Sequence, residues 1–592
     1  MANYSVADIA VLHTPSCAPT LPQANYDGIY EEAIVLPSGH RRTPQNRAFD
    51  VATIWERDVA FKTREGLILR ADVFRPEFTT AQIPALVAWS PYGKSGTGSL
   101  DLTVVPGRAG IPIGMVSGFQ SFEAFDPAEW VKYDYAVVNV DAQGILSSEG
   151  HHKWHGSAEG RDGYDIVEAI AALPWCNGRV ALMGNSWLAS AQWFIASMRP
   201  PHLTCILPLE GLSDVYRESL CRGGVPYLPF WTFLGYNLFG HKPREDTIAM
   251  IKQHPLMNGY WADKRAQAHL IDIPAYILAS MSTSLHTVGS IRCFEDIPHQ
   301  KKWLRMNATQ EWHDLYQRET VDDLKMFLDF YTKDVPNGWE QTPQVRISVL
   351  RYNKPAITNV PFTSWPIPAT VHQELYLSQG SSLVTTPVPT VGSQTYQSDV
   401  PALQTDADSG FTAFTHTFAS LTTLIGPSRA VLYMSCEEHD DMDVFVILRK
   451  LNAAGEVLRN INIPVQDLVD IHSDVQVPLI NTMQYIGPSG VLRASHRRLD
   501  PELTKPHWPA HDHSVEEKVP PGSIVKLEIG LWPAAIQFEA GESLSLRIAG
   551  HSMVLAEFEP LRGAFQTGNV GKHVVHFGGD YESKLILALV DI

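Results

Sequence analysis

The stretch RVALMGNSWLASAQWFIAS, residues 179–197, decides the fold class. An apolar strand leads into the turn Gly184-Asn185-Ser186, and an alanine-rich run that is compatible with a helix follows at once. A serine on such a turn holds its hydroxyl above the end of a sheet, at a helix N-terminus whose N–H groups can stabilise an oxyanion. Ser186 is therefore the candidate nucleophile, with a structural serine as the alternative.

The Gly-x-Ser pattern alone is a weak signal, because it recurs at several other places in the chain. Only the copy at Ser186 has a strand pattern before it and a helical pattern after it. Leu188 replaces the last glycine of the usual G-x-S-x-G motif, and the small Ala189 follows it. The context of the serine, rather than the motif, carries the prediction.

Short apolar runs rich in β-forming residues alternate with helical stretches around this motif. Such alternation predicts a mostly parallel sheet covered by helices. The predicted strands are ALVAW (85–89), YAVVNV (135–140), RVALM (179–183), TCILPL (204–209), IPAYILAS (273–280) and KKWLRMN (301–307).

Three regions of the chain differ from this α/β pattern in composition and residue spacing. The N-terminal region is Pro-rich and irregular, an aromatic-rich helical stretch interrupts the α/β part, and short strands separated by Pro and Gly turns follow it. The predicted parts are an N-terminal extension (1–45), a first α/β segment (46–210), a helical cap (211–270), a second α/β segment (271–345) and a jelly-roll β-sandwich (346–592).

Composition narrows the function classes. The 592 residues include 46 Lys and Arg and 64 Asp and Glu, which gives a net charge of −18. Because the chain also has no long basic run, we do not expect nucleic acid as a partner. The six cysteines form no CxxC pair and predict neither a disulfide framework nor a four-cysteine zinc site. No secretory signal or membrane-spanning run is visible. We expect a cytoplasmic protein without membrane partner, metal or cofactor, either a monomer or a homodimer.

The candidate histidine lies beyond the last predicted parallel strand. Serine hydrolases of this fold place their triad in the chain order Ser, acid, His. His313, in NATQEWHDLY just after KKWLRMN, is in the expected place, although a surface or structural histidine is the alternative. We predict that it is the general base to Ser186 and then the general acid to the leaving group.

Several sequence blocks together resemble the CocE/NonD family of serine hydrolases. They are RADVFRP, SPYGK, DAQGILSSEG, the block around Ser186, EWHDLY, ASHRRLDPE and GLWPAAIQFEAGESLSLRIAGH. The resemblance runs from about residue 50 to 592. It implies an α/β-hydrolase domain with a mostly parallel sheet and helices on both faces, a helical cap insertion and a C-terminal all-β jelly roll.

The resemblance also implies roles for individual residues. Ser186 falls on the family's nucleophile, and His313, after Trp312, falls on its histidine. The tyrosine of the P-Y block, Tyr92, would donate its hydroxyl to the oxyanion beside the backbone N–H of Trp187. Without the resemblance, Tyr92 would be taken as a capped or buried tyrosine.

The acid is where the sequence departs from the family pattern. Relatives place an Asp just after the strand that corresponds to IPAYILAS, but this chain continues MSTSLHTVGS, with Thr283 and Ser284 at that place. Some α/β-hydrolases take the acid from the end of the preceding strand, which gives Glu210, with Asp214 second. A Ser-His pair without an acid is the remaining alternative.

The leading hypothesis is a serine hydrolase that cleaves an ester or amide of a bulky, largely apolar small molecule through an acyl-enzyme on Ser186. Trp187, Tyr227 and Trp231 are the predicted substrate-binding residues. Other cap aromatics, Phe230, Tyr260 and Trp261, are candidates too, although cap aromatics are more commonly core.

Two other hypotheses stay open. An X-Pro dipeptidyl-peptidase would need a carboxylate cluster for the substrate's ammonium group, which the sequence does not reveal. The missing Asp keeps a third class in view: a non-hydrolytic catalyst, an acyltransferase or a ligand-binding protein that retains the hydrolase fold.

Overall fold

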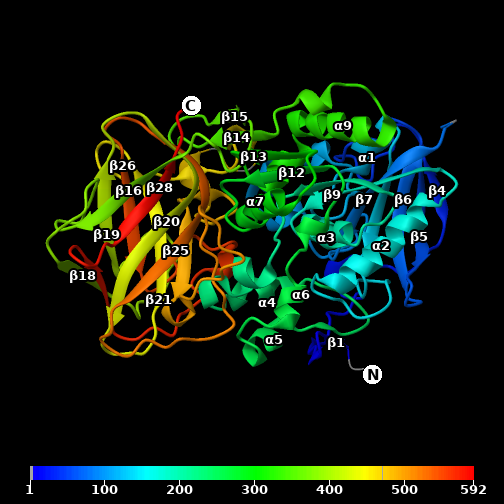
Figure 1. Cartoon of the computed structure of the whole chain (residues 1–592). Helices are drawn as coiled ribbons and strands as arrows, with labels where there is room; N and C mark the ends of the chain where they lie inside the picture. The colour runs from blue at the N-terminus through cyan, green and yellow to red at the C-terminus, as the bar shows by residue number, and fades with distance from the viewer. Residues whose placement is uncertain (1–3, 80, 470, 472) are drawn as a thin grey trace.

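Two β-rich halves lie side by side, and short helices fill the lower part of the junction between them (Figure 1). The computed structural model describes residues 4–79, 81–469, 471 and 473–592. The N-terminal half carries a twisted sheet covered by helices, and the C-terminal half consists of strands with few helices. This architecture confirms the predicted fold class.

An 11-stranded sheet forms the first half, in the order β15-β14-β13-β12-β10-β9-β7-β8-β6-β5-β4. The strands from β14 to β8 are parallel, and antiparallel strands flank them on both sides. The strands are β4 (Ala33–Leu36), β5 (Thr53–Lys62), β6 (Ile68–Pro76), β7 (Ile83–Ser90), β8 (Ala136–Asp141), β9 (Cys176–Asn185), β10 (Leu203–Leu209), β12 (Ala275–Ser280), β13 (Lys302–Asn307), β14 (Val345–Val349) and β15 (Ile357–Phe362).

Helices cover both faces of this sheet. Helices α2 and α3 pack against each other and against β7 and β9, whereas α9 packs against β9 and β10. The helices of this half are α1 (Pro127–Trp130), α2 (Ser157–Ala171), α3 (Trp187–Ser197), α7 (Thr287–Asp296), α8 (Glu311–Tyr316) and α9 (Arg318–Lys333). Residues Trp187 to Ser197 are all buried, which explains why α3 is apolar on every side.

The carboxyl ends of the parallel strands meet at one edge of the sheet. Asn185 at the end of β9 pairs with Leu209 at the end of β10, and Ser280 at the end of β12 pairs with Asn307 at the end of β13. The segments that follow these four strands therefore leave the sheet at the same edge, where ligands bind in open α/β folds.

The cap consists of short helical elements. It contains a π-helical turn (Tyr216–Leu220), a 3-10 turn (Arg222–Gly224), α4 (Leu228–Tyr236), α5 (Thr247–Gln253) and α6 (Gly259–Asp263). Its two-residue strand β11 (Arg244–Glu245) pairs with β3 (His13–Thr14), so the N-terminal extension is fastened to the cap.

Three strands near the expected domain boundaries join the first sheet. Strand β14 begins at Val345 and β15 lies wholly beyond it, yet both belong to the first sheet. Strand β4, inside the expected extension, pairs with β5 at the sheet edge. The sequence could not separate these strands from their surroundings, because short alternating runs look the same whichever sheet they join.

The C-terminal strands form the jelly roll. Their pairings are antiparallel except for the contact between β17 and β19. The strands are β16 (Val371–Ser378), β17 (Ser382–Val384), β18 (Gly392–Gln397), β19 (Phe411–Thr417), β20 (Thr422–Cys436), β21 (Asp443–Leu451), β24 (Ser489–Arg493), β25 (Val525–Phe538), β26 (Ser543–Ala549), β27 (Lys572–Phe577) and β28 (Lys584–Leu589). A separate pair, β22 (Asn460–Ile461) with β23 (Gln484–Tyr485), lies in the long connection between β21 and β24.

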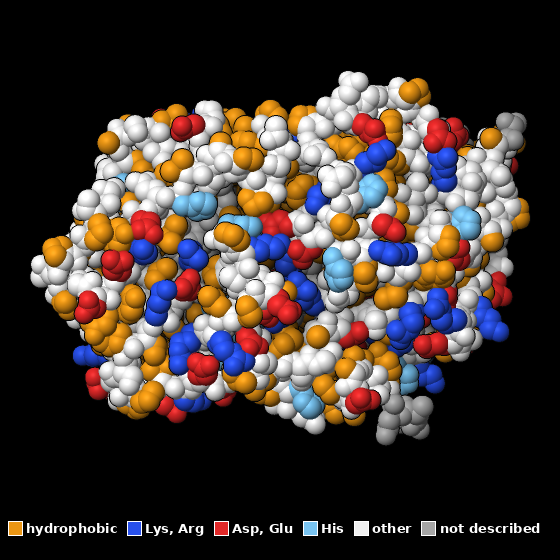
Figure 2. All heavy atoms as spheres, viewed as in Figure 1, with side chains coloured by type: hydrophobic (Ala, Val, Ile, Leu, Met, Phe, Trp, Pro, Cys, Tyr) orange, Lys and Arg blue, Asp and Glu red, His pale blue; other side chains and the backbone are white. Residues whose placement is uncertain are grey.

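The surface mixes charges of both signs. On the face in Figure 2, acidic and basic side chains alternate over both halves. All six cysteines are free thiols. In the part of the chain that the structure describes, no helix combines the length and apolarity that a bilayer crossing needs.

Candidate active site

The sharp turn between β9 and α3 presents Ser186. Its backbone angles, φ 54° and ψ −116°, are strained for a non-glycine residue, and strain of this kind concentrates at functional sites. Its N–H donates to the carbonyl of Glu210 at 3.0 Å. A Cβ on Gly184 would lie 2.6 Å from that of Leu188, so only glycine fits two places before the serine. The local sequence therefore fixes the hydroxyl at the sheet edge.

Ser186, His286 and Glu311 form a relay of one hydrogen bond and one ion-pair contact. The Oγ of Ser186 lies 3.2 Å from Nε2 of His286, and Nδ1 of His286 lies 3.2 Å from Oε2 of Glu311. Both His286 and Glu311 are buried. This is the nucleophile, base and orienting carboxylate arrangement of a serine hydrolase.

The base and the acid of this relay are neither His313 nor Glu210, the two residues that the sequence predicted. His286 ends the loop between β12 and α7, where relatives have the Asp, and Glu311 begins α8 just after β13, where a histidine was expected. Their chain order is therefore Ser, His, acid. The loop after β12 has no carboxylate at Thr283 or Ser284 and supplies the imidazole of His286 instead.

The structure does not bring His313 to Ser186. Its Nε2 lies 3.1 Å from Oδ2 of Asp467, and its Nδ1 lies 3.7 Å from Asp314. Residues two apart on a helix point about 200° from one another, so the helix that aims Glu311 at the relay turns His313 away. In the described part of the chain, the Ser186 hydroxyl bonds to His286 and the His313 ring bonds to Asp467.

Glu210 lies beside the relay rather than in it. It follows β10 and is buried, with its carbonyl bound to the N–H of Ser186. Burial, followed by the nearby carboxyl groups of Glu311 and Asp314, raises the pKa of Glu210 well above its usual range. The ion pair of His286 is with Glu311, so Glu210 is better suited to be a neutral neighbour. Asp214, the second candidate, pairs with Arg217 instead.

Glu210, together with His286 and Glu311 of the relay, offers a set of metal-binding donors. One donor atom each from Glu210, His286 and Glu311 lies within 4.8 Å of the others. One imidazole and two carboxylates can hold a divalent cation. The imidazole, however, already joins a serine to a carboxylate, which is complete hydrolase geometry without a metal.

The expected oxyanion donors flank the serine. Tyr92, just after β7, is buried and lines the same cavity as Ser186. Burial, followed by the Glu123 carboxyl group, raises the pKa of Tyr92 well above its usual range, so its hydroxyl keeps its proton. Trp187 is the first residue of α3, and the N–H of such a residue has no acceptor within its helix.

Glu123 is a buried carboxyl group at the site that no sequence motif marks. Its Oε1 accepts a hydrogen bond from Nε1 of Trp312 at 3.2 Å, and its carbonyl accepts one from the N–H of Asn185 at 2.9 Å. Burial, followed by the charge of Glu311, raises its pKa well above the usual range. Its Oε2 is buried without a hydrogen-bond partner in the described part of the chain.

The cavity over Ser186 is small and mainly apolar. Its volume is about 50 Å³, and the cap, the α/β half and the jelly roll all contribute to its wall. The apolar lining residues are Leu100, Val104, Phe122, Phe230, Phe233, Leu234, Leu285, Trp312 and Phe558. The jelly roll also contributes polar Asn481, Thr482 and Glu557.

The three predicted substrate-binding side chains lie outside this cavity. The ring of Trp187 packs 4.9 Å from that of Trp154, and its Nε1 donates to Glu159. Trp231 is buried.

The hydroxyl of Tyr227 donates to Glu557 at 2.8 Å, and Tyr227 lines an adjoining cavity of about 100 Å³. Because helical side chains one residue apart diverge, Phe230 reaches the catalytic cavity and Trp231 does not. The other two candidates, Tyr260 and Trp261, are buried in the cap.

Two family models match the chain. The model described as X-Pro dipeptidyl-peptidase (S15 family) matches residues 65–242, and the model of the X-Pro dipeptidyl-peptidase C-terminal non-catalytic domain matches residues 337–586. Ser186 lies in the first segment, whereas His286 and Glu311 lie between the two.

Curated relatives match a smaller part. The chain is 31% identical over 166 residues to a candidate serine esterase of Mycobacterium bovis, and 28% identical over 160 residues to the cocaine esterase of Rhodococcus sp.. Each match covers 27% of this chain, and 25% and 24% of those proteins respectively, so it spans about a quarter of each relative.

Solved structures match over nearly the whole chain. A CocE/NonD family hydrolase from Staphylococcus aureus is similar with a TM-score of 0.83 at 29% identity, covering 96% of this chain and 98% of that one. An α-amino acid ester hydrolase is similar with a TM-score of 0.67 at 15% identity, covering 91% and 97%. The second likeness concerns the fold alone.

Proposed function

The chain belongs to the CocE/NonD family of serine hydrolases, and on this premise we propose that it cleaves a carboxylic ester or amide through an acyl-enzyme on Ser186. The observation that carries the proposal is the continuous relay from the serine hydroxyl through His286 to Glu311. The hypothesis of a non-hydrolytic catalyst rested on a missing acid, and the position of Glu311 beside His286 supports hydrolysis instead.

Each residue of the site has a role in this reaction. His286 takes the proton of Ser186 as the hydroxyl oxygen attacks the substrate carbonyl, and Glu311 orients and stabilises the imidazolium that forms. The tetrahedral oxyanion receives hydrogen bonds from the Tyr92 hydroxyl and the N–H of Trp187. His286 then protonates the leaving alcohol or amine, and water activated by the same imidazole releases the acid.

The walls favour an apolar acyl group. A cavity of about 50 Å³ over Ser186 holds only part of a bulky molecule. Leu285, Asn481 and Glu557 line both this cavity and its neighbour of about 100 Å³. We therefore propose a bulky, largely apolar substrate whose second part extends between the cap and the jelly roll.

A substrate with a free ammonium group is the second candidate, as in the X-Pro dipeptidyl-peptidase hypothesis. Glu123 and Glu557 line the catalytic cavity, and burial raises the pKa of both carboxyl groups. An ammonium group beside them would favour their ionised forms. The apolar substrate and the second candidate therefore differ in whether the substrate carries a positively charged ammonium group.

Labelling and turnover test the proposal together. A fluorophosphonate probe should label the wild type but neither Ser186→Ala nor His286→Ala, whereas His313→Ala should label as the wild type does. The same four proteins are assayed with p-nitrophenyl acyl esters of several chain lengths. A folded wild type that neither labels nor turns over any ester would contradict the proposal.

Matched amine substrates separate the two candidates. Gly-Pro-p-nitroanilide is compared with its N-acetyl form, and a free amino acid p-nitrophenyl ester with its N-acyl form. Preference for the acylated or neutral compounds supports the apolar substrate, and preference for the free amines supports the second candidate.

A further inference from the structure

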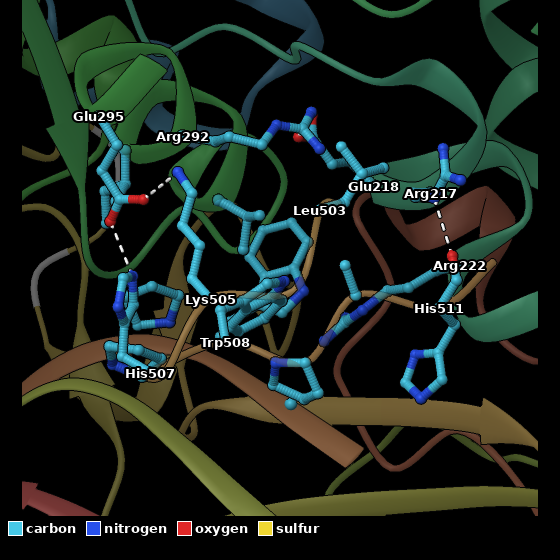
Figure 3. A pocket seen from close by; sticks show the side chains of 18 of the residues that line it. Arg217, Glu218, Arg222, Arg292, Glu295, Leu503, Lys505, His507, Trp508 and His511 are labelled. Atoms are coloured by element: carbon cyan, nitrogen blue, oxygen red, sulfur yellow. Dashed lines mark hydrogen bonds and ion pairs between the residues drawn. The ribbon is translucent and has the colours of Figure 1, made fainter. Parts of the chain in front are cut away.

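A third cavity lies away from Ser186, at the junction of α7, the cap and the jelly roll (Figure 3). Its volume is about 150 Å³, roughly the size that holds one benzene ring. The cap contributes Arg217 and Arg222, α7 contributes Arg292 and Glu295, and the jelly roll contributes the segment around Trp508. Arg222 and Trp532 also line the cavity of about 100 Å³ that adjoins the catalytic one, whereas the segment around Trp508 lines only this space.

Most cations around this cavity already have carboxylate partners. Arg217 lies 3.1 Å from Asp214, and Lys505 lies 2.9 Å from Asp296. Arg292 pairs with Glu218. Arg265 lies 3.6 Å from both Asp214 and Asp296. These groups neutralise one another and leave little charge for a ligand.

Arg222 differs from these cations. Its guanidinium donates to the backbone carbonyl and the hydroxyl of Ser489 and lies over the ring of Trp532, 4.5 Å from its centre. Within residues 4–79, 81–469, 471 and 473–592, no carboxylate pairs with it. Burial lowers the pKa of Arg222, which means that its charged form lacks compensation.

The rest of the cavity wall suits an aromatic ring. Trp508 and Trp532 contribute indole rings, and Val288, Ile291 and Leu503 are aliphatic. Figure 3 shows the side chain of Trp508 directed into the space between Lys505 and His511. An uncompensated guanidinium beside apolar walls is complementary to a ligand with an anionic end and an apolar ring.

We propose that this cavity binds a small aromatic monocarboxylate, with its carboxylate on Arg222 and its ring between the indoles. A guanidinium and a carboxylate form paired, charge-assisted hydrogen bonds, and these are strongest where water is excluded. Binding needs no covalent step, although Arg222 lies in the wall between this cavity and the one that the proposed substrate enters.

Direct binding to the full-length Ser186→Ala protein tests the site without turnover. Calorimetric titration compares 3-phenylpropionate with 3-phenylpropanamide, which has the same ring and chain without the charge. We expect the acid to bind and the amide to bind at least about tenfold more weakly, because hydrogen bonds to charged groups are the stronger ones. Adding Arg222→Met should weaken binding of the acid about tenfold to a hundredfold, and Arg222→Lys should restore part of it.

Arg547→Met is the matched control. Arg547 also lies over an aromatic ring of the jelly roll, 4.7 Å from the centre of Phe411, but it does not line this cavity. It should leave the affinity unchanged. If Arg222→Met does not fold, Arg222→Gln, which keeps a donor for Ser489, replaces it. Absence of binding to the Ser186→Ala protein, or equal affinity with and without the Arg222 side chain, would overturn the proposal.

Discussion

Nδ1 of His286 and Oε2 of Glu311 lie 3.2 Å apart, although the two residues follow neighbouring parallel strands, β12 and β13. The ends of these strands meet at one edge of the sheet, so the histidine and the acid can come from either one. The geometry of the relay thus constrains the positions of the groups in space and leaves their order along the chain free.

Glu311→Gln should abolish most of the activity. Replacing the orienting carboxylate leaves the imidazolium uncompensated, and loss of such a carboxylate costs up to about 10⁴ in kcat. Ester hydrolysis at saturating substrate measures this loss.

Glu210→Gln is the control for that change. Because the Glu210 carboxyl group is buried with its pKa raised well above the usual range, an amide replaces a group that is already neutral. We expect kcat to fall less than about tenfold, within the range of a modest buried change. A larger loss in Glu210→Gln than in Glu311→Gln would reverse the assignment.

Tyr92→Phe tests the oxyanion donor. Removing one such donor costs about 10² to 10³ in kcat with little change in KM, since the hydrogen bond strengthens only in the transition state. Steady-state kinetics with a p-nitrophenyl ester measures both constants. An unchanged kcat would show that Tyr92 is only a wall of the cavity.

Two neighbouring aromatic residues of α4 should separate binding from stability. Phe233 is half-buried and lines the catalytic cavity, where its ring lies 5.2 Å from that of Phe558. Phe233→Ala should raise KM for apolar esters about tenfold, because the substrate loses the binding free energy of burying apolar surface against this ring.

Trp231→Ala is the comparison. Trp231 is buried, and its Nε1 donates to Ser219. Its removal should lower the free energy of unfolding by about 3–5 kcal/mol, as core aromatic truncations do. Thermal unfolding of both variants checks this, and a fall in stability confined to Phe233→Ala would contradict it.

Asp141→Asn should change how stability depends on pH. Burial, partly opposed by the charge of Lys94, raises the pKa of Asp141 from 3.8 to about 7. The folded protein therefore holds a proton that the unfolded chain loses near pH 4. The stabilisation from this proton is complete below about pH 4 and is lost as the pH rises through about 7.

The wild type should consequently lose more stability than Asp141→Asn between pH 4 and 7, by up to about 4 kcal/mol, since one pKa unit corresponds to about 1.4 kcal/mol. Urea unfolding of both proteins at several pH values measures the difference. Parallel stability curves would mean that Asp141 titrates alike in the folded and unfolded chains.

The sequence revealed the fold and the serine but not the rest of the relay. The strand and helix patterns around Ser186 are local, so neighbouring residues disclose them. His286 was visible in MSTSLHTVGS and Glu311 in EWHDLY, each within six residues of the end of a predicted strand. Chain order pointed to His313 instead, because a linear pattern does not say which side of the short helix α8 faces the serine.

Contacts made by distant segments were also beyond the sequence. Nothing near Glu123 marks it as part of the site, since its neighbours there come from other elements, such as Trp312 in α8. The same applies to Glu557 and Asn481, which reach the catalytic cavity from the jelly roll. Packing within the α/β half brings Glu123 to the site, and packing between the two halves brings Asn481 and Glu557 there.

The jelly roll supplies part of the catalytic cavity while holding none of the three relay residues. Asn481, Thr482, Glu557 and Phe558 come from two of its connections, whereas Ser186, His286 and Glu311 sit on the ends of the parallel sheet. Part of the substrate-facing wall is thus encoded in a module separate from the one that carries the reacting groups. Exchanging the connections at 479–483 and 555–561 offers a route to redirect substrate choice while the reacting groups stay as they are.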